Sequence, residues 1–197
     1  MTGLRETASI ARLAQLLLYL QAAVAAGSAA LTWTRGLGEP LLPVEFTVWL
    51  VQVAAFVAAM AAMLIWLYRA SANVRVLGAS NMVVSPGLAV VWWFVPIANL
   101  VMPFQTVREL WKASANPADW EIERAPATTI WWWTFWLLAG IAGAIALRLS
   151  LEPDKEAAAP ADAFLVASDL LYIPAVILVA RIIAGIEAMQ QRRRAGT

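Results

Sequence analysis

The sequence contains no cysteine and no histidine, and only 14% of its 197 residues are charged. The lack of cysteine excludes disulfides, iron–sulfur clusters and thiol nucleophiles, and the lack of histidine removes the commonest metal ligand and the usual catalytic base. We therefore expect neither a metal nor a cofactor. A formal net charge of +1 gives no strongly basic surface for nucleic acid. Apolar residues make up 62% of the chain, and this composition predicts a membrane protein rather than a soluble domain.

Long segments without an ionisable side chain locate the membrane-spanning helices. Three such segments lie between Arg12 and Arg35, between Glu45 and Arg69, and between Arg124 and Arg148. At about 1.5 Å per residue each can cross the hydrocarbon core of roughly 30 Å, and only a helix satisfies its own backbone there. A fourth apolar segment contains one carboxylate, Asp169. The sequence thus predicts an all-α protein with one integral membrane domain, residues 1–197, and four spans at about 10–34, 45–68, 128–150 and 163–184.

The uncharged segment after the second span is different, because Pro86, Pro96 and Pro103 divide it. A proline inside a helix removes a hydrogen bond and clashes with the preceding turn. We expect a short helix from Pro86 to Val95, a break, and a second short helix, forming a proline-broken re-entrant hairpin over residues 86–102. A kinked span is the alternative. Three residues are expected to wedge the hairpin between neighbouring helices: Trp92, Trp93 and Pro96.

The distribution of lysine and arginine favours one orientation. With four spans and a re-entrant hairpin, eleven basic residues lie inside, namely Arg5, Arg12, Arg69, Arg75, Arg108, Lys112, Arg124, Arg181, Arg192, Arg193 and Arg194. Only three lie outside, Arg35, Arg148 and Lys155. Because cytoplasmic loops carry the excess of basic residues, we expect a multi-pass protein of the cell inner (plasma) membrane with cytoplasmic N- and C-termini.

The residues after Pro103 predict a cytoplasmic interfacial amphipathic helix at about 103–114. Phe104, Val107 and Trp111 share one helical face, and the polar side chains point away from it. Such a helix lies along the headgroups with its apolar face down. Basic residues on it and at the C-terminus are expected to contact lipid headgroups. These residues are Arg108, Lys112, Arg192, Arg193 and Arg194.

Two further features concern the spans themselves. Asp169 lies about six residues into the last span, roughly 9 Å below its outer end, and Arg148 near the outer end of the preceding span is its expected partner in an intramembrane ion pair.

Small residues four apart, such as Ala22, Ala26 and Ala30, predict faces for close helix packing. These contacts can lie within one chain or between chains.

Residues 66–111 read WLYRASANVRVLGASNMVVSPGLAVVWWFVPIANLVMPFQTVRELW. This segment resembles the bacterial membrane family DUF4328, a domain of unknown function. The resemblance rests on the serine-proline at Ser85 and Pro86, the tandem tryptophans before a Pro-Ile-Ala-Asn-Leu core, and the following Val-Arg-Glu-Leu-Trp helix. It implies a fold and a motif, but no activity. The polar residues of the motif are expected to form a cluster beside the kinked backbone: Arg69, Asn73, Asn99, Arg108 and Glu109.

Three function classes follow from these patterns. The first is a non-enzymatic accessory, scaffold or regulatory subunit of a larger membrane complex, whose partners are membrane lipids and other integral membrane proteins or a second copy of itself. The second is a small transporter, channel or lipid-binding protein with its site in the broken hairpin. The third, an intramembrane enzyme, is disfavoured because no nucleophile–base pair or aspartate-rich metal motif occurs in the apolar segments.

Overall fold

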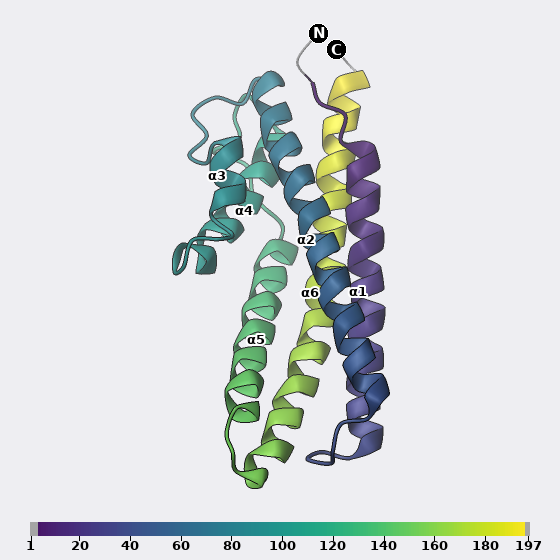
Figure 1. Cartoon of the computed structure of the whole chain (residues 1–197). Coiled ribbons are helices and arrows are strands. Elements are labelled where there is room, and N and C mark those ends of the chain that lie inside the picture. Colours follow the sequence, from purple (N-terminus) through teal and green to yellow (C-terminus); the bar gives the residue numbers. More distant parts are fainter. Residues whose placement is uncertain (1–3, 196–197) are drawn as a thin grey trace. The chain divides into compact units, whose positions relative to one another are not determined.

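The computed structural model describes residues 4–195, apart from the side chain of Lys155, one of the basic residues assigned to the outside. Within this range every regular element is a helix, in the order α1 (Ala8–Arg35), α2 (Pro43–Val76), α3 (Pro86–Val91), η1 (Ala98–Leu100), α4 (Met102–Ala115), α5 (Ala127–Ser150), η2 (Lys155–Ala157) and α6 (Ala158–Ala195) (Figure 1). Helices α1, α2, α5 and α6 are long and apolar enough to cross a membrane. The prediction of an all-α membrane protein with four such helices is confirmed.

Helices α2 and α6 are longer than the predicted spans. The expected span at 45–68 is part of a helix that continues to Val76, and the span at 163–184 is part of one that ends at Ala195. Segments free of charge mark only the part that fits the hydrocarbon core, whereas backbone hydrogen bonding continues through polar residues. The basic residues Arg192, Arg193 and Arg194 in the last turn of α6 also complement the negative end of its dipole.

The proline-rich segment forms shorter helices than expected. Helix α3 begins after Ser85, whose hydroxyl accepts from the Leu88 amide at 3.3 Å, and it ends at Val91 rather than Val95. The expected second helix is only the three-residue turn η1, because the chain reverses at Ile97. Ile97 has φ 67° and ψ −50°, and the Ala98 amide donates to the Pro96 carbonyl at 2.8 Å. This is a γ-turn of the rare, strained kind, and it interrupts any helix.

The chain divides into two compact units, each described by itself. Unit 1 comprises Met1–Leu16, Ala59–Ile130 and Val179–Thr197, and unit 2 comprises Leu17–Ala58 and Trp131–Leu178. Unit 1 therefore contains α3, η1 and α4 with the first part of α1 and the last parts of α2 and α6. Unit 2 contains the remainder of α1 and α2, most of α5 and the first part of α6.

The two units have cores of different composition. Unit 1 buries large side chains, among them Trp66, Leu67, Leu110 and Ile183. In unit 2 most buried apolar residues are small, including Ala25, Ala29, Ala55, Ala139 and Ala142. Small side chains allow helix backbones to approach closely.

Candidate functional site

The five residues of the expected polar cluster do not form one site. Arg69 donates to the Glu6 carbonyl at 3.2 Å, and Asn73 exchanges two hydrogen bonds with the Arg5 backbone, at 2.7 and 2.9 Å. Both side chains therefore attach the N-terminal segment to α2 within unit 1. Asn99 and Arg108 are exposed. The structure brings Arg69 and Asn73 together at the N-terminal segment, and it places Asn99 and Arg108 at the surface.

Glu109, the fifth member, is buried, although it was expected on the polar face of α4. Its carboxylate accepts from the Val83 and Val84 amides at 2.6 and 3.2 Å. Arg75 donates to the Val84 carbonyl at 2.7 Å, so the loop before α3 is held from both α2 and α4. Glu109 thus has a structural partner in the loop backbone.

The aromatic residues of this segment differ in their surroundings. Trp92 and Trp93 follow α3 and are half-buried, and Pro96 is exposed. On α4, Trp111 packs against Gly185 of α6, so closely that a Cβ at Gly185 would lie 2.5 Å from the indole. Trp111 therefore contacts helix α6 rather than facing only lipid.

Three of the five basic residues expected at lipid headgroups donate to backbone carbonyl groups. Arg193 donates to the Ser114 carbonyl at 3.3 Å and also to the Ala115 carbonyl, at the end of α4. Arg194 donates to the Arg5 carbonyl at 2.7 Å. Lys112 donates to the Glu121 carbonyl at 2.8 Å and lies over the Trp120 ring. Arg108 and Arg192 are exposed.

The sequence did not single out Glu187, a buried carboxylate of α6 in unit 1. It accepts from Trp66 Nε1 at 2.8 Å and from Thr7 Oγ1 at 3.1 Å. Its position directly after Ile186, on a helix with Ile182 and Ile183 buried, is the only sequence signal that it faces inward. Because its oxygens are occupied by these donors, Glu187 is a structural residue.

The expected ion pair between Arg148 and Asp169 does not form. Arg148 pairs with Glu152 one turn later at 2.9 Å, and both side chains are exposed. Asp169 is only 4% exposed, and its Oδ1 accepts from Gln52 Nε2 of α2 at 2.7 Å. The prediction is wrong because depth alone selected Arg148, whereas the rotation of α6 turns Asp169 toward α2.

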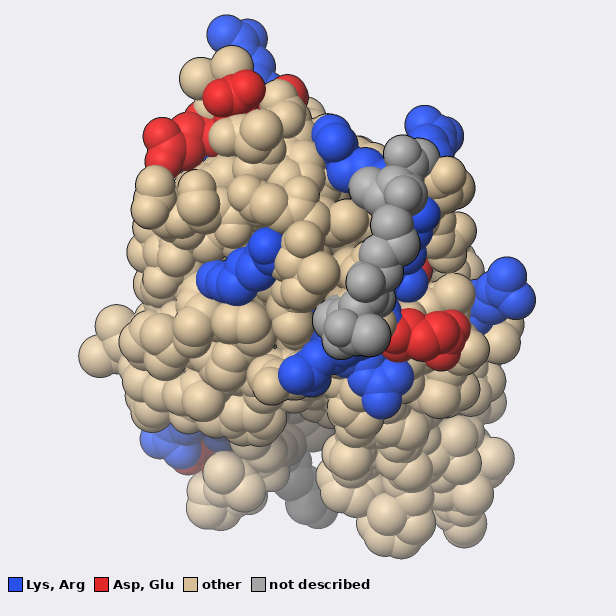
Figure 2. Space-filling model, turned by 90° about the horizontal axis from the view of Figure 1, so that it is seen from above, with Lys and Arg blue, Asp and Glu red and all other residues tan. Residues whose placement is uncertain are grey.

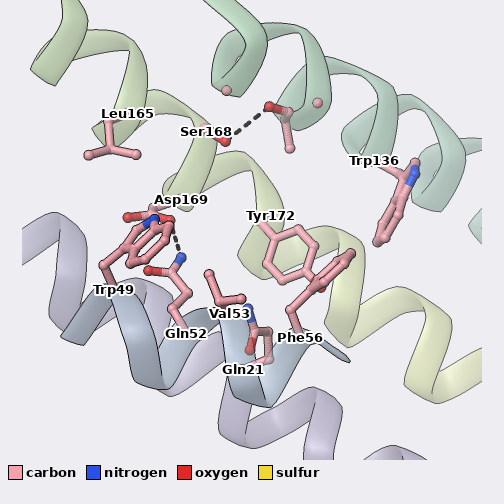
Figure 3. Close-up of a pocket in the computed structure, with 13 residues that line it drawn as sticks. Gln21, Trp49, Gln52, Val53, Phe56, Trp136, Leu165, Ser168, Asp169 and Tyr172 are labelled. Atoms are coloured by element: carbon pink, nitrogen blue, oxygen red, sulfur yellow. Dashed lines mark hydrogen bonds between the residues drawn. The ribbon is translucent and has the colours of Figure 1, made fainter. Parts of the chain in front are cut away.

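Asp169 lines a pocket of about 390 Å³ within unit 2 (Figure 3). Side chains from four helices surround it: Gln21 of α1; Trp49, Gln52, Val53 and Phe56 of α2; Trp136, Ala139, Gly140 and Gly143 of α5; Leu165, Ser168, Asp169 and Tyr172 of α6. The contributors on each of α2, α5 and α6 are three or four residues apart, and so they share one helical face. Glycine and alanine on α5 leave the space that the larger side chains border.

The pocket has a polar part and an aromatic part (Figure 3). Asp169 and Gln52 form the polar part, and the hydroxyl of Ser28, which is not among the lining residues, also interacts with the Asp169 carboxylate. The Oδ2 atom of Asp169 is buried without a hydrogen bond of normal geometry. The rings of Phe56, Trp136 and Tyr172 form the aromatic part, with centroids 5.7 to 6.4 Å apart. These distances are typical of aromatic clusters.

A second cavity of about 320 Å³ in unit 2 shares Trp49, Gln52 and Leu165 with the first. It also reaches Glu45, which belongs to a partly buried ionic group. In that group the Arg35 guanidinium contacts Glu45 at 2.9 Å and Asp162 at 2.8 Å. One guanidinium faces two carboxylates, so this group carries an excess negative charge.

The comparisons with known proteins identify a family. The model described as "Domain of unknown function (DUF4328)" matches residues 43–188, which is more than half of the chain. No curated protein and no solved structure matches the sequence. The matched range includes all of the α2, α5 and α6 residues that line the pocket around Asp169. The chain belongs to the DUF4328 family.

Proposed function

We propose that this chain is a non-enzymatic protein of the plasma membrane that holds a small ligand in the pocket around Asp169. The observation that carries the proposal is a buried carboxylate lining a 390 Å³ pocket on helices apolar enough to span a membrane. Ionisable residues inside membrane spans are costly and commonly mark substrate or ion sites. The volume is also in the range of small-molecule sites. We therefore propose a ligand site in unit 2, whereas the sequence had suggested one in the broken hairpin.

Native mass spectrometry of the full chain, extracted gently from its own membrane, tests this function. The variants are Gly140→Leu and Gly27→Leu. A Cβ at either glycine meets nothing within 4 Å, so both variants are expected to fold, but only Gly140 lines the pocket. We expect a stoichiometric small molecule on the wild type and on Gly27→Leu, and its loss from Gly140→Leu. Equal retention by both variants, or no retained molecule on the wild type, contradicts the proposal.

A second candidate function is an accessory or scaffold subunit of a membrane complex. It is favoured by one face of α1, where Ala23, Ala26, Gly27 and Ala30 are exposed. Small residues at this spacing let a helix of another protein approach closely. The same two variants separate the candidates. A protein partner or second copy lost from Gly27→Leu and retained by Gly140→Leu supports the accessory function.

The charge distribution supports cytoplasmic termini. The segments of unit 1 contain eleven basic and six acidic residues, and those of unit 2 contain three basic and seven acidic residues. In the view of Figure 2 the basic side chains are spread over the face, and the acidic ones form a few groups. An excess of basic residues on the cytoplasmic side is the general rule. By that rule, the unit that contains both ends of the chain lies inside.

The exposed apolar residues of segment 86–102 support its insertion into lipid as a re-entrant element. Phe94 and Ile97 are 71% and 82% exposed, and Leu88, Val91 and Leu100 are also exposed. Helix α3 has six residues, or about 9 Å at the usual rise, and cannot cross the bilayer. Helix α4 follows as the interfacial helix, with Gln105 and Arg108 exposed.

A further inference from the structure

We propose that the pocket around Asp169 selects a monovalent organic cation, an amine or quaternary ammonium group carried on an apolar body. This inference rests on the proposed function and names its ligand class. The cationic head lies beside the Asp169 carboxylate, and the apolar body lies against Phe56, Trp136 and Tyr172.

The charge of the lining is the first argument. None of the 13 lining residues is a lysine or arginine, and Asp169 is the sole carboxylate among them. Its hydrogen-bond donor, Gln52, is a neutral amide, and Arg148 is paired elsewhere. A buried carboxylate without a cationic partner carries a large desolvation cost. A cationic ligand supplies that partner and contacts the second oxygen, Oδ2, which is buried and has no hydrogen bond of normal geometry.

The aromatic lining is the second argument. Trp49, Phe56, Trp136 and Tyr172 come from three helices and all border the same cavity. The rings attract a cation through their electron-rich faces, and cages of this type recognise quaternary ammonium groups. Most of the remaining lining is apolar, such as Val53 and Leu165, which suits the apolar body of an amphipathic cation. An anionic ligand would meet the Asp169 carboxylate and these ring faces without a lysine or arginine among the lining residues to offset them.

The electrostatic potential around the pocket also favours a cation. The segments of unit 2 carry four more acidic than basic residues. The second cavity connects the neighbourhood of Glu45 to Trp49 and Gln52 of the pocket, and the Arg35 group beside it keeps an excess negative charge. A negative potential raises the local concentration of cations at a cleft. We place the entry of the cation on the side of Glu45, because the second cavity shares Trp49, Gln52 and Leu165 with the pocket.

The test compares a cation with an uncharged molecule of the same shape. Benzyltrimethylammonium and neopentylbenzene differ in one atom, nitrogen against carbon. Their binding to the full chain in detergent micelles is measured by calorimetry, with Gly140→Leu micelles as the blank. We expect the wild type to prefer the cation by about tenfold or more, the ratio that 1.4 kcal/mol gives. Asp169→Asn keeps an oxygen for the Gln52 amide and is expected to lose the preference.

Two variants make the result specific. Glu152→Gln removes a carboxylate of unit 2 outside the pocket and is expected to keep the preference. Phe56→Leu keeps an apolar side chain, retains Asp169, and is expected to weaken cation binding about threefold to tenfold through loss of a ring face. It also provides the test if Asp169→Asn does not fold.

Each remaining outcome overturns one of the two proposals. Equal binding of both probes by the wild type, or a preference unchanged in Asp169→Asn, overturns the ligand class while the pocket remains a binding site. Binding of neither probe, with a different molecule retained in native mass spectrometry, also overturns the class alone. Binding of neither probe and no retained molecule overturns the proposed function itself.

Discussion

Trp66 Nε1 donates a hydrogen bond of 2.8 Å to Glu187 Oε1, and both side chains are almost fully buried, at 1% and 6% exposure. The same carboxylate accepts from Thr7 Oγ1. The contact therefore joins α2, α6 and the start of the chain within unit 1. A carboxylate buried in this way depends on each of its donors.

Trp66→Phe is expected to lower the free energy of unfolding by about 2 kcal/mol or more, because a buried acceptor loses its donor and the smaller ring leaves a cavity. Denaturant unfolding in detergent, followed by circular dichroism, measures the change. Trp33→Phe is the control, since Trp33 is 68% exposed. Equal effects of the two substitutions would show that the hydrogen bond to Glu187 contributes nothing.

Arg35 and Arg148 offer a matched comparison of a buried and an exposed ion pair in unit 2. The Arg35 side chain is 3% exposed between Glu45 and Asp162, whereas Arg148 is 74% exposed beside Glu152. Arg35→Met leaves two partly buried carboxylates without their cation and should cost more, up to about 3–5 kcal/mol. Arg148→Met should cost less than about 1 kcal/mol. Denaturant unfolding of both variants under the same conditions measures the two losses in unfolding free energy. Similar losses would contradict the expected difference between the two ion pairs.

Gly185 and Trp111 form a contact that admits no side chain at position 185. The methyl of Gly185→Ala would lie 2.5 and 2.6 Å from two atoms of the indole, and overpacking of this kind costs about 1–3 kcal/mol. Gly27→Ala is the control, because nothing lies within 4 Å of its Cβ.

A smaller ring at position 111 tests whether the clash with the indole causes the destabilisation by Gly185→Ala. Trp111→Phe removes the atoms that the new methyl meets, so it should destabilise the wild type but partly relieve the Gly185→Ala variant. A double-mutant cycle measures this coupling, and contacting residues typically show about 0.5–3 kcal/mol. If the effects of the two substitutions on the unfolding free energy simply add, the contact between Trp111 and Gly185 is contradicted.

Glu109 holds the loop before α3 through the Val83 and Val84 amides. Glu109→Ala should therefore lower the hydrogen-exchange protection of these two amides by about tenfold or more, because an anchored loop opens locally once its acceptor is removed. Gln105→Ala, an exposed position one turn earlier on α4, should leave the protection unchanged. Unaltered exchange in Glu109→Ala would assign the anchoring to Arg75 alone.

Sequence alone was enough to place the four long helices and the break between α2 and α4. Charge-free segments of spanning length, such as the one before Arg35, admit only helices because no other backbone satisfies itself in lipid. Pro86 and Pro103 predicted where helices begin, because proline fits the first helical turn. The helix ends were less certain, since α2 and α6 continue beyond their apolar parts. Pro174 shows a further limit, because it lies within α6 without ending it.

Tertiary structure decided which faces of these helices meet. Asp169 was visible in the sequence as a carboxylate inside a span, but its neighbour Gln52 and the ring of Phe56 come from α2, more than 100 positions away. Depth along a span fixes how far a residue lies from the membrane surface, but not the direction in which it points. That direction depends on helix rotation, which packing sets through small residues such as Gly143, whose Cβ would lie 3.1 Å from the Ser168 hydroxyl. The spans follow from local composition, whereas the pocket follows from contacts between distant segments.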